Sequence, residues 1–363
     1  MKHNWEYKKL GEVCEVLYGY PFDSSYFNID GRGMPLIRIR DVKSGKTSTF
    51  YSDSNYSKEY IIKKGDFLIG MDGEFNISPW KSDEALLNQR VCKISSKHDS
   101  LFTHYLFYFL ILELKKIEDK TPFVTVKHLS DKVLKSVKVP IPTVEIQKNI
   151  IKELDEINSM IEGRKEQIKL LDQLAQSIFY EMFGDPNVKL PFDYKKIEDV
   201  TINLDSKRIP ITQKNREFGI YPYYGASGIV DYVSDFIFDG TFLLVSEDGA
   251  NLLVRSHPIA FIAKGKIWVN NHAHILDCDN YSSKIFISFY LNLLDFHEKI
   301  TGMAQPKFTQ QALNQTKIAW PPISLQEEFA ARIELIEEQK KDIENSIKEL
   351  ETLLASRMDY WFN

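Results

Sequence analysis

The chain has 363 residues, 43% of them hydrophobic and 27% charged, with a net charge of −5, and this length is enough for two domains that each bury a core. No uncharged apolar run is long enough to span a membrane and the start of the chain lacks an apolar leader segment, which argues against a membrane protein and a secreted one. The three cysteines are an odd number and lie far apart, so we expect a cytoplasmic protein without a disulfide framework or a cysteine zinc site.

The first predicted domain covers residues 1–142. Short apolar runs alternate there with turns rich in Gly, Asp, Asn and Pro, a pattern that predicts strands over Phe67–Met71 and Arg90–Ile94. The run Phe102–Glu118 predicts a helix. Residues 1–143 carry a net charge of +4, so this domain can present a positive face although the whole chain is acidic.

A long helix is predicted over residues 143–185, directly after the proline cluster Pro140–Pro142. The segment has strong helix formers and almost no Gly. With Gln147 as position a of a heptad, nine of the eleven a and d positions are apolar. A period of about 3.5 residues, sustained over about five heptads, is typical of a coiled-coil seam. Residues 144–185 have a net charge of −4.

The second predicted domain covers residues 186–322, where positive and negative side chains balance. Its apolar runs predict strands over Phe242–Ser246, Ile259–Ala263 and Ala273–Asp277, and a helix over Lys284–Glu298. Like the first domain, it therefore mixes helices and strands.

A second long helix is predicted over residues 323–363, which carry a net charge of −5. Moving the heptad frame by 179 residues, from Gln147 to Gln326, places apolar residues at eight of eleven a and d positions. The simplest pairing is an antiparallel coiled coil ~55 Å long, about the length of 16 base pairs. Two amphipathic helices that pack on separate cores are the alternative. The predicted seam consists of Ile150, Leu154, Ile157, Ile161, Ile168, Leu171, Ile333, Ile336, Ile343, Ile347, Leu350 and Leu354.

Three stretches of the first half return in the same order in the second half. The distance between matching stretches drifts from 175 to 187 residues, which indicates a duplicated framework with loops of different length. We therefore predict an α+β protein with two similar mixed α/β domains in tandem, separated by a pair of long antiparallel coiled-coil helices. The matching stretches are Trp5–Leu10 and Phe192–Ile197, Gly65–Ile69 and Gly240–Leu244, and Pro140–Pro142 and Pro321–Ile323.

Motifs for methyl transfer and nucleotide binding are absent. Trp320–Pro322 lacks the polar residue that begins an adenine methyltransferase motif, and no loop for S-adenosylmethionine is visible. Ser44–Thr47 ends like a phosphate-binding loop, but Arg40 stands where the first glycine is required. We therefore expect no catalytic residue on this chain.

Two polar groups leave weaker alternatives open. His272 and His274 share one face of a predicted strand, with Cys278 beyond, which would suit a metal ion, although no second group of ligands is visible. Four acids in loops after apolar strands would suit a nuclease, but no Glu-x-Lys lies in register with them. These acids are Asp72, Glu74, Glu247 and Asp248.

Loops of both predicted domains are rich in aromatic, amide and basic side chains, the types that reach base edges and phosphates in protein–DNA complexes. Each of them alone fits a core aromatic or a solvated charge equally well, so the prediction rests on their collective bias. The candidate DNA contacts are Tyr18, Tyr20, Arg38, Arg40, Asn76, Lys81, Gln89, Arg90, Lys207, Arg208, Tyr223, Tyr224, Ser227, Asn251, Arg255, Asn271, His272 and Lys307.

The sequence resembles specificity subunits of type I restriction-modification systems. The resemblance rests on Tyr223–Val230, Glu247–Asn251 and Asn270–His274, together with the Pro-Pro and Leu-Gln pairs that open the second long helix. The first half matches less well, because it has Asn88–Val91 where the second half has Asn271–His274. The similarity covers nearly the whole chain.

The resemblance implies a non-catalytic, sequence-specific subunit of a DNA adenine methyltransferase and endonuclease complex. Each domain would be a target recognition domain that reads one half of a bipartite site in double-stranded DNA. The helices would set the spacer and dock two methyltransferase subunits, and two restriction and translocase subunits would join for cleavage. S-adenosylmethionine, ATP and magnesium would serve those partners, so this chain would bind no cofactor. A coiled-coil scaffold unrelated to DNA and an intrinsic nuclease or methyltransferase remain as alternatives.

Overall fold

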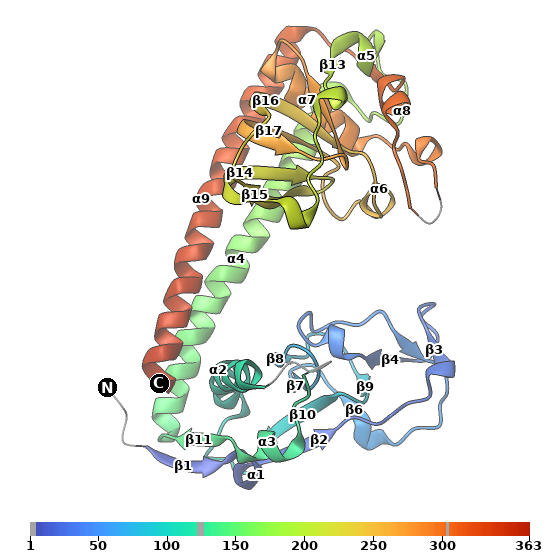
Figure 1. Ribbon diagram of the computed structural model, residues 1–363. Helices are drawn as coiled ribbons and strands as arrows, with labels where there is room; N and C mark the ends of the chain where they lie inside the picture. Colours follow the sequence, from blue (N-terminus) through green and yellow to red (C-terminus); the bar gives the residue numbers. More distant parts are fainter. Residues whose placement is uncertain (1–4, 122–126, 303–304) are drawn as a thin grey trace. The chain divides into compact units, whose positions relative to one another are not determined.

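The chain forms two compact units in the computed structural model (Figure 1). Each unit holds one α/β globule and one half of each long helix. Unit 1 comprises residues 1–164 and 346–363, and unit 2 comprises residues 165–345. The structure describes residues 5–121, 127–302 and 305–363. The domain borders derived from the sequence, which set each long helix apart as a segment of its own, stay a prediction.

The globule of unit 1 is built on a four-stranded antiparallel sheet in the order β2-β10-β7-β8. Helix α2 (Thr103–Lys120) packs on this sheet, because Ile69, Ile94 and Tyr105 belong to one buried core. The two predicted strands and the predicted helix of this globule are present, with ends shifted by one or two residues. Residues 1–4, with which the first predicted domain begins, lie outside the described residues. The strands are β2 (Cys14–Tyr18), β10 (Val91–Ser96), β7 (Phe67–Gly70) and β8 (Asn76–Pro79).

A second sheet of unit 1 has five short strands in the order β3-β5-β4-β9-β6. Only β4 and β9 run parallel; the other neighbours are antiparallel. Its strands are β3 (Phe27–Asn28), β5 (Phe50–Tyr51), β4 (Met34–Ile37), β9 (Ala85–Leu87) and β6 (Ile61–Ile62).

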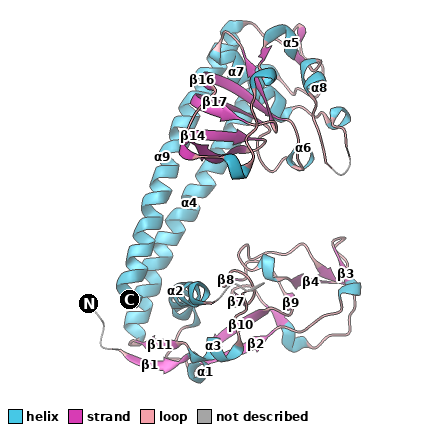
Figure 2. Ribbon diagram, viewed as in Figure 1, coloured by secondary structure: helices cyan, strands magenta, loops and turns pink. Residues whose placement is uncertain are grey.

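The globule of unit 2 contains a six-stranded sheet in the order β13-β18-β16-β17-β14-β15. Helix α7 (Tyr281–Leu293) packs on it, and Phe286 and Tyr290 share a buried core with Leu243 and Ala260 (Figure 2). The strands are β13 (Ile202–Asn203), β18 (Ala273–Asp277), β16 (Phe238–Ser246), β17 (Ala260–Val269), β14 (Phe218–Gly225) and β15 (Gly228–Val233).

Helix α7 lies several residues before the position that the sequence predicts. It begins at Tyr281 because the side chain of Asn280 caps it, accepting a hydrogen bond from the Ser282 N–H at 2.8 Å. It ends at Leu293, since the N–H of Asp295 donates to Asn187 Oδ1 at 2.7 Å and not to a helix carbonyl. The predicted end at Glu298 was therefore wrong.

The two halves that the sequence predicts to be duplicated have corresponding strand orders. In unit 1 strand β10 lies between β2 and β7, and in unit 2 strand β18 lies between β13 and β16. The parallel pair β4-β9 of unit 1 has its counterpart in the parallel pair β14-β17 of unit 2. In both globules a helix that follows these strands covers the sheet. The two globules are thus variants of one fold.

The two long helices are continuous over 40 residues each, as α4 (Val144–Phe183) and α9 (Ile323–Phe362). The order of their ion pairs along the two helices shows that the helices are antiparallel. In unit 1, Arg357 Nη2 donates to Glu153 Oε2 at 3.1 Å, and in unit 2, Lys340 Nζ lies 2.8 Å from Asp172 Oδ1. A later residue of α4 is therefore paired with an earlier residue of α9. The predicted pair of long antiparallel helices is confirmed.

The predicted seam residues point into the protein. Ile150, Leu154, Ile157 and Ile161 of α4 are buried, and Ile168 and Leu171 are half-buried. On α9, Ile333 and Ile336 are buried, and Ile343, Ile347, Leu350 and Leu354 are half-buried. Burial of this stripe removes apolar surface from water along both helices. Within the described residues, no helix is apolar and long enough to cross a membrane.

A buried glutamine fastens the start of each long helix to its own globule. The side chain of Gln147 accepts from the Phe102 N–H at 2.9 Å and donates to the carbonyl oxygens of Ser100 and Pro142, both at 3.0 Å. Gln326 accepts from the Ser283 hydroxyl at 2.7 Å and donates to the Pro321 carbonyl oxygen at 2.9 Å. These fully buried amides are satisfied, so each helix leaves its globule in a fixed direction.

Candidate nucleic-acid interface

Three segments of unit 1 meet beside the end of β7. The N–H of Met71 donates to the Arg90 carbonyl at 2.9 Å, and the N–H of Leu129 donates to the Met71 carbonyl at 2.7 Å. The N–H of Gly73 donates to the Lys127 carbonyl at 2.9 Å. Gly73 has a φ of +73°, which residues with a side chain rarely adopt. Backbone bonds therefore hold the Asp-Gly loop between the start of β10 and the segment before helix α3 (Asp131–Ser136).

Unit 2 repeats the same backbone bonds beside the end of β16. The N–H of Glu247 donates to the His272 carbonyl at 2.9 Å, and the N–H of Phe308 donates to the Glu247 carbonyl at 2.7 Å. The N–H of Gly249 donates to the Pro306 carbonyl at 3.0 Å. The two loops are therefore equivalent in detail and not only in sequence.

These bonds correct the alignment of the two halves. They match Arg90 with His272 and so Asn88 with Asn270, one residue away from the predicted pairing of Asn88 with Asn271. Asn88 and Asn270 are both buried, at 7% and 5% exposed. Sequence alone cannot show that Asn270, which is buried, and not the exposed Asn271 is the residue that corresponds to Asn88.

In unit 1, one carboxylate holds two basic side chains from two different segments. Asp72 Oδ1 lies 2.6 Å from His128 Nδ1, and Asp72 Oδ2 lies 3.3 Å from Arg90 Nε. The carboxylate is mostly covered, with 22% of its side chain exposed, while Arg90 and His128 are exposed to 56% and 49%. We call these three residues the Asp72 cluster.

In unit 2, the equivalent carboxylate belongs to Asp248. Its Oδ2 lies 2.8 Å from His272 Nδ1, and its side chain is 15% exposed while that of His272 is 47% exposed. The backbones of Lys307 and Asp248 form an isolated antiparallel β-bridge. The Lys307 side chain pairs with another acid, because its Nζ lies 3.1 Å from Glu247 Oε1. We call Asp248, His272 and Lys307 the Asp248 cluster. Both clusters thus place two exposed basic residues beside one half-buried aspartate, although in unit 2 the Lys307 ammonium pairs with Glu247.

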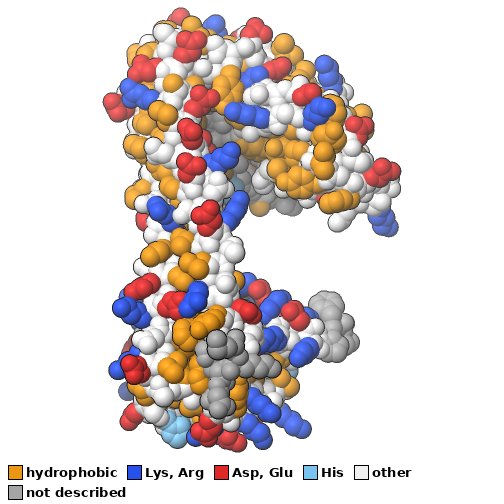
Figure 3. Space-filling view, turned by 90° about the vertical axis from the view of Figure 1, so that its left-hand side faces the viewer, with side chains coloured by type: hydrophobic (Ala, Val, Ile, Leu, Met, Phe, Trp, Pro, Cys, Tyr) orange, Lys and Arg blue, Asp and Glu red, His pale blue; other side chains and the backbone are white. Residues whose placement is uncertain are grey.

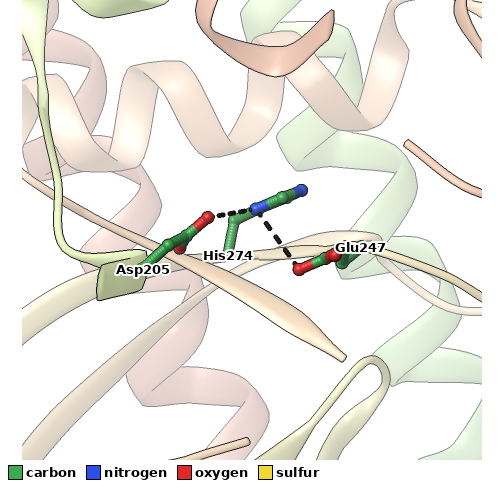
Figure 4. A group of neighbouring side chains, drawn as sticks. All are labelled: Asp205, Glu247 and His274. Atoms are coloured by element: carbon green, nitrogen blue, oxygen red, sulfur yellow. Dashed lines mark hydrogen bonds and ion pairs between the residues drawn. The ribbon is translucent and has the colours of Figure 1, made fainter. Parts of the chain in front are cut away.

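Asp205, Glu247 and His274 form a network of charged side chains next to the Asp248 cluster in the chain (Figure 4). His274 Nδ1 lies 2.6 Å from Asp205 Oδ2 and 3.7 Å from Glu247 Oε2, and His274 Nε2 lies 2.7 Å from the Phe308 carbonyl. Arg208 bridges both carboxylates, with Nη1 2.8 Å from Glu247 Oε2 and Nη2 3.3 Å from Asp205 Oδ2.

The neighbours of the two acids in the network lower the pKa values of both. Burial by itself would raise the pKa of Asp205, but the hydrogen bond and charge of His274, the N–H of Ile275 and the charge of Arg208 hold that pKa below its usual value. Burial by itself would also raise the pKa of Glu247. Arg208, His274 and Lys307 outweigh this effect, so the pKa of Glu247 is lowered as well. Both ring nitrogens of His274 face hydrogen-bond acceptors, Asp205 Oδ2 at Nδ1 and the Phe308 carbonyl at Nε2.

Asp205, Glu247 and His274 offer ligand atoms within 4.8 Å of one another. In the structure these atoms contact one another and the Phe308 carbonyl. His272 and Cys278, which the sequence suggested as further ligands, do not join this group. His272 points to Asp248, and the Cys278 thiol donates to the Asn280 carbonyl at 3.4 Å.

The acids considered for a nuclease are engaged by basic side chains. Asp72 and Asp248 hold the two clusters, and Glu247 belongs to the buried network. Glu74 Oε1 lies 2.6 Å from Lys43 Nζ. Carboxylates that bind catalytic metals need free oxygens facing one another, which this arrangement does not offer.

Eleven of the predicted DNA contacts are exposed. Four more are half-buried: Tyr18, Asn76, Tyr224 and Asn251. Tyr18 donates to Asp131, and the Asn251 side chain is engaged with Ser256 and His257. The exposed ones are Tyr20, Arg38, Arg40, Lys81, Gln89 and Arg90 in unit 1, and Lys207, Ser227, Asn271, His272 and Lys307 in unit 2.

Three predicted contacts are engaged inside unit 2, and their contact with DNA stays a prediction. Arg208, 12% exposed, belongs to the buried network. Tyr223 is 1% exposed, and its hydroxyl donates to the Ile211 carbonyl. The Arg255 guanidinium packs 4.2 Å over the ring of Phe296 and donates to the carbonyls of Leu252, Leu291 and Leu294. All three side chains contact other residues of the same globule.

Sequence reasoning missed His128, and it considered Asp72 and Asp248 only as acids that would suit a nuclease. A signal for His128 does exist. Lys127-His128-Leu129-Ser130 and Pro306-Lys307-Phe308-Thr309 both end in a hydroxyl residue that caps a short helix, with Ser130 accepting from Val133 and Thr309 from Ala312. The shared pattern of a basic residue, a large apolar residue and a helix cap would have found the pair.

The sequence matches the family model "Type I restriction modification DNA specificity domain" twice, over residues 2–170 and 190–352. The EcoBI specificity subunit of Escherichia coli is 38% identical over 173 residues, which are 48% of this chain and 36% of that protein, so the match spans about a third of the relative's length. The MjaVIII specificity subunit of Methanocaldococcus jannaschii is 24% identical over 400 residues, covering 97% of this chain and 92% of that protein.

The same fold occurs in a solved structure. The crystal structure of the S subunit of a type I restriction-modification system from M. genitalium superimposes with a TM-score of 0.55 at 12% identity, and the alignment covers 98% of this chain and 96% of that chain. At this identity the likeness shows the fold alone.

Proposed function

Because the chain belongs to the family of type I restriction-modification DNA specificity domains, we propose that it selects the DNA sequence for a type I methyltransferase and endonuclease complex. In this proposal each globule reads one half of a bipartite site in double-stranded DNA, and chemistry is left to two methyltransferase and two restriction subunits. S-adenosylmethionine, ATP and magnesium serve those partners, and this chain binds none of them.

The observation that carries the proposal is the duplicated surface. Two globules of one topology each present two exposed basic residues beside one aspartate, at equivalent places and with different residues. A repeated framework with divergent surface residues suits two related sites of different sequence. Uneven charge supports the same assignment, since the acidic segments are the long helices and the globules are not acidic.

The decisive experiment compares the chain alone with the chain bound to its methyltransferase partner. The complex should bind duplex DNA tightly, in a sequence-selective and salt-sensitive way, whereas the chain alone should bind weakly. Fluorescence anisotropy at several salt concentrations measures both. Adenine methylation mapped in cells with and without the chain gives the bipartite site, and methylation that is unchanged without the chain contradicts the proposal.

We further assign the docking of methyltransferases to the long helices. Large hydrophobic side chains lie exposed among charged ones on their surfaces (Figure 3). Leu174 of α4 and Leu353 of α9 occupy the same position of the shared heptad frame, 179 residues apart, and are 48% and 45% exposed. Exposed apolar side chains at matching positions suit two copies of one partner.

A pair of single variants tests this docking. Leu174→Asp and Leu353→Asp should each reduce the complex from two methyltransferase copies to one, and the double variant should bind none. Native mass spectrometry counts the copies. Lys169→Asp, an exposed change on the same helix, is the matched control and should keep both. Full assembly of the double variant would show that these positions do not dock the partner.

The helices are also proposed to set the spacer between the half-sites. Deleting one heptad from each helix, residues 161–167 and 340–346, shortens both by about 10 Å, or ~3 base pairs. Methylation mapping should then show a shorter spacer with unchanged half-sites. Deleting the heptad from α4 alone mismatches the seams and should abolish assembly. An active double deletion with an unchanged spacer would show that the helices do not measure DNA.

A further inference from the structure

The two clusters occupy equivalent positions but carry different basic residues. At the start of β10 and β18 stand Arg90 and His272, and at the end of the loop that precedes the short helix stand His128 and Lys307. Identical backbone bonds in both globules locate these side chains, as described above. At these positions the two globules therefore share the backbone arrangement and differ in the hydrogen-bonding groups of the side chains.

Each aspartate uses only part of its basic partner. Arg90 Nε lies 3.3 Å from Asp72 Oδ2, an ion-pair distance, and among the described residues no hydrogen bond engages the Nη groups. His272 lies against Asp248 through Nδ1, at 2.8 Å, with 47% of its side chain exposed, so Nε2 is the nitrogen left for a ligand. A guanidinium held by Nε keeps its two-pronged end for a ligand, the geometry that matches O6 and N7 of guanine.

The backbone beneath Arg90 is constrained as well. Arg90 has a φ of +72°, one of two positive values among the described residues other than glycine. Such a conformation is uncommon for a residue with a side chain and persists only where its surroundings impose it. Here the Met71 N–H bonds its carbonyl, and the Val91 N–H bonds Asn88 at 3.3 Å. The side chain thus starts from a fixed point, which lowers the entropy lost on binding.

We propose that Arg90 and His272 are the base-reading residues of the two globules, and that Asp72 and Asp248 are positioning residues that aim them. Arg90 reads a guanine in the first half-site, whereas His272, with one outward nitrogen, reads a different base in the second. This assignment rests on the proposed function, since it names the residues that the selection of DNA would use. Lys307 contributes a phosphate contact without sequence preference.

The first test uses the full complex with the methyltransferase partner and maps methylated adenines. Arg90→Ala should relax the first half-site at one guanine, with a loss of roughly 10- to 100-fold in discrimination there, and leave the second half-site unchanged. Asp72→Asn should relax the same position, and Asp72→Glu, which keeps the carboxylate, should restore much of it. Arg32→Ala is the matched control, because Arg32 also pairs with an aspartate at the surface of unit 1, at 3.2 Å from Asp30.

The second test transfers one residue between the globules. His272→Arg should make one position of the second half-site accept guanine and leave the first half-site unchanged. His297→Arg is the control, since His297 forms an exposed pair with Asp295 at 2.6 Å and should change nothing. Lys307→Ala should weaken binding to all sequences alike and lower the salt slope by about one.

The outcomes separate this inference from the proposed function. If the wild-type complex has no bipartite site, the proposed function fails and this inference with it. If the wild type has such a site and Arg90→Ala, Asp72→Asn and His272→Arg all leave it unchanged while the proteins stay folded, only this inference is overturned. Equal relaxation by Arg32→Ala also overturns it, because the effect would then be general surface charge.

Discussion

Replacing Asp205 by asparagine should destabilise unit 2 by about 3 to 5 kcal/mol, the usual cost of removing one partner from a buried ion pair. The carboxylate accepts from His274 Nδ1 at 2.6 Å and from the Ile275 N–H at 2.9 Å. It also lies 3.3 Å from Arg208 Nη2. The amide can keep the bond to Ile275, but Arg208 and His274 then share Glu247 as their only carboxylate in the network.

Hydrogen exchange measured by mass spectrometry can follow each unit separately. Amides of β18 should exchange roughly 10²- to 10³-fold faster in the variant, because each 1.4 kcal/mol corresponds to about a factor of ten. Amides of β10, the equivalent strand of unit 1, should keep their rates and serve as an internal reference.

A surface substitution completes the design. Asp231 pairs with Arg216 at 3.1 Å with 36% of its side chain exposed, so Asp231→Asn should cost less than about 1 kcal/mol. The reasoning is refuted if Asp205→Asn accelerates β18 by less than tenfold, or if β10 accelerates equally.

Three further predictions concern pH and the long helices. The pKa values of Asp205 and Glu247 are lowered in the folded protein, so their contribution to stability is complete above their ordinary values of 3.8 and 4.5. This contribution is lost as pH falls through the lower folded pKa values. The difference in stability between the wild type and Asp205→Asn should therefore become smaller in acid, and a difference that grows contradicts this. Gly163→Ala fills open space within α4 and should stabilise the protein by about 1 kcal/mol, measured as a higher Tm, whereas a fall would show that the helix needs glycine. Gln147→Leu leaves three backbone groups unpaired and should cost about 3 kcal/mol or more, with faster exchange in the first turns of α4 and unchanged rates at Gln326.

The repeat and the heptads were predictable because both depend on local, periodic patterns. Apolar side chains every three or four residues can form only one kind of buried stripe, so Ile150 and Ile333 could be placed inside without any knowledge of tertiary structure. The strand at residues 67–70 was predictable for the same reason. The end of α7 was not, since the bond from Asp295 to Asn187 joins residues 108 positions apart.

Most of the candidate surface lay beyond sequence reasoning, because a polar side chain in a loop faces water or the interior according to distant partners. Arg208 looks like a DNA contact until Glu247, 39 residues later, is placed beside it. Arg90 and His128 look unrelated until Asp72 joins them. The types of residue in these loops were predictable as a group. The orientation of each side chain was not, because it depends on contacts with residues that are distant in the sequence.

Backbone groups hold the loops of the Asp72 and Asp248 clusters in place, whereas side chains determine what these loops can bind. In unit 2 the interior next to the Asp248 cluster contains Glu247 and His274, whereas the matching positions of unit 1 are Met71 and Cys92, 7% and 0% exposed. Such an exchange of interiors would normally move a loop. Here the three backbone bonds around each loop are the same, because peptide groups make them without regard to the side chains. The interior and the exposed tips can therefore change independently, which is what a framework needs if each copy is to acquire its own target.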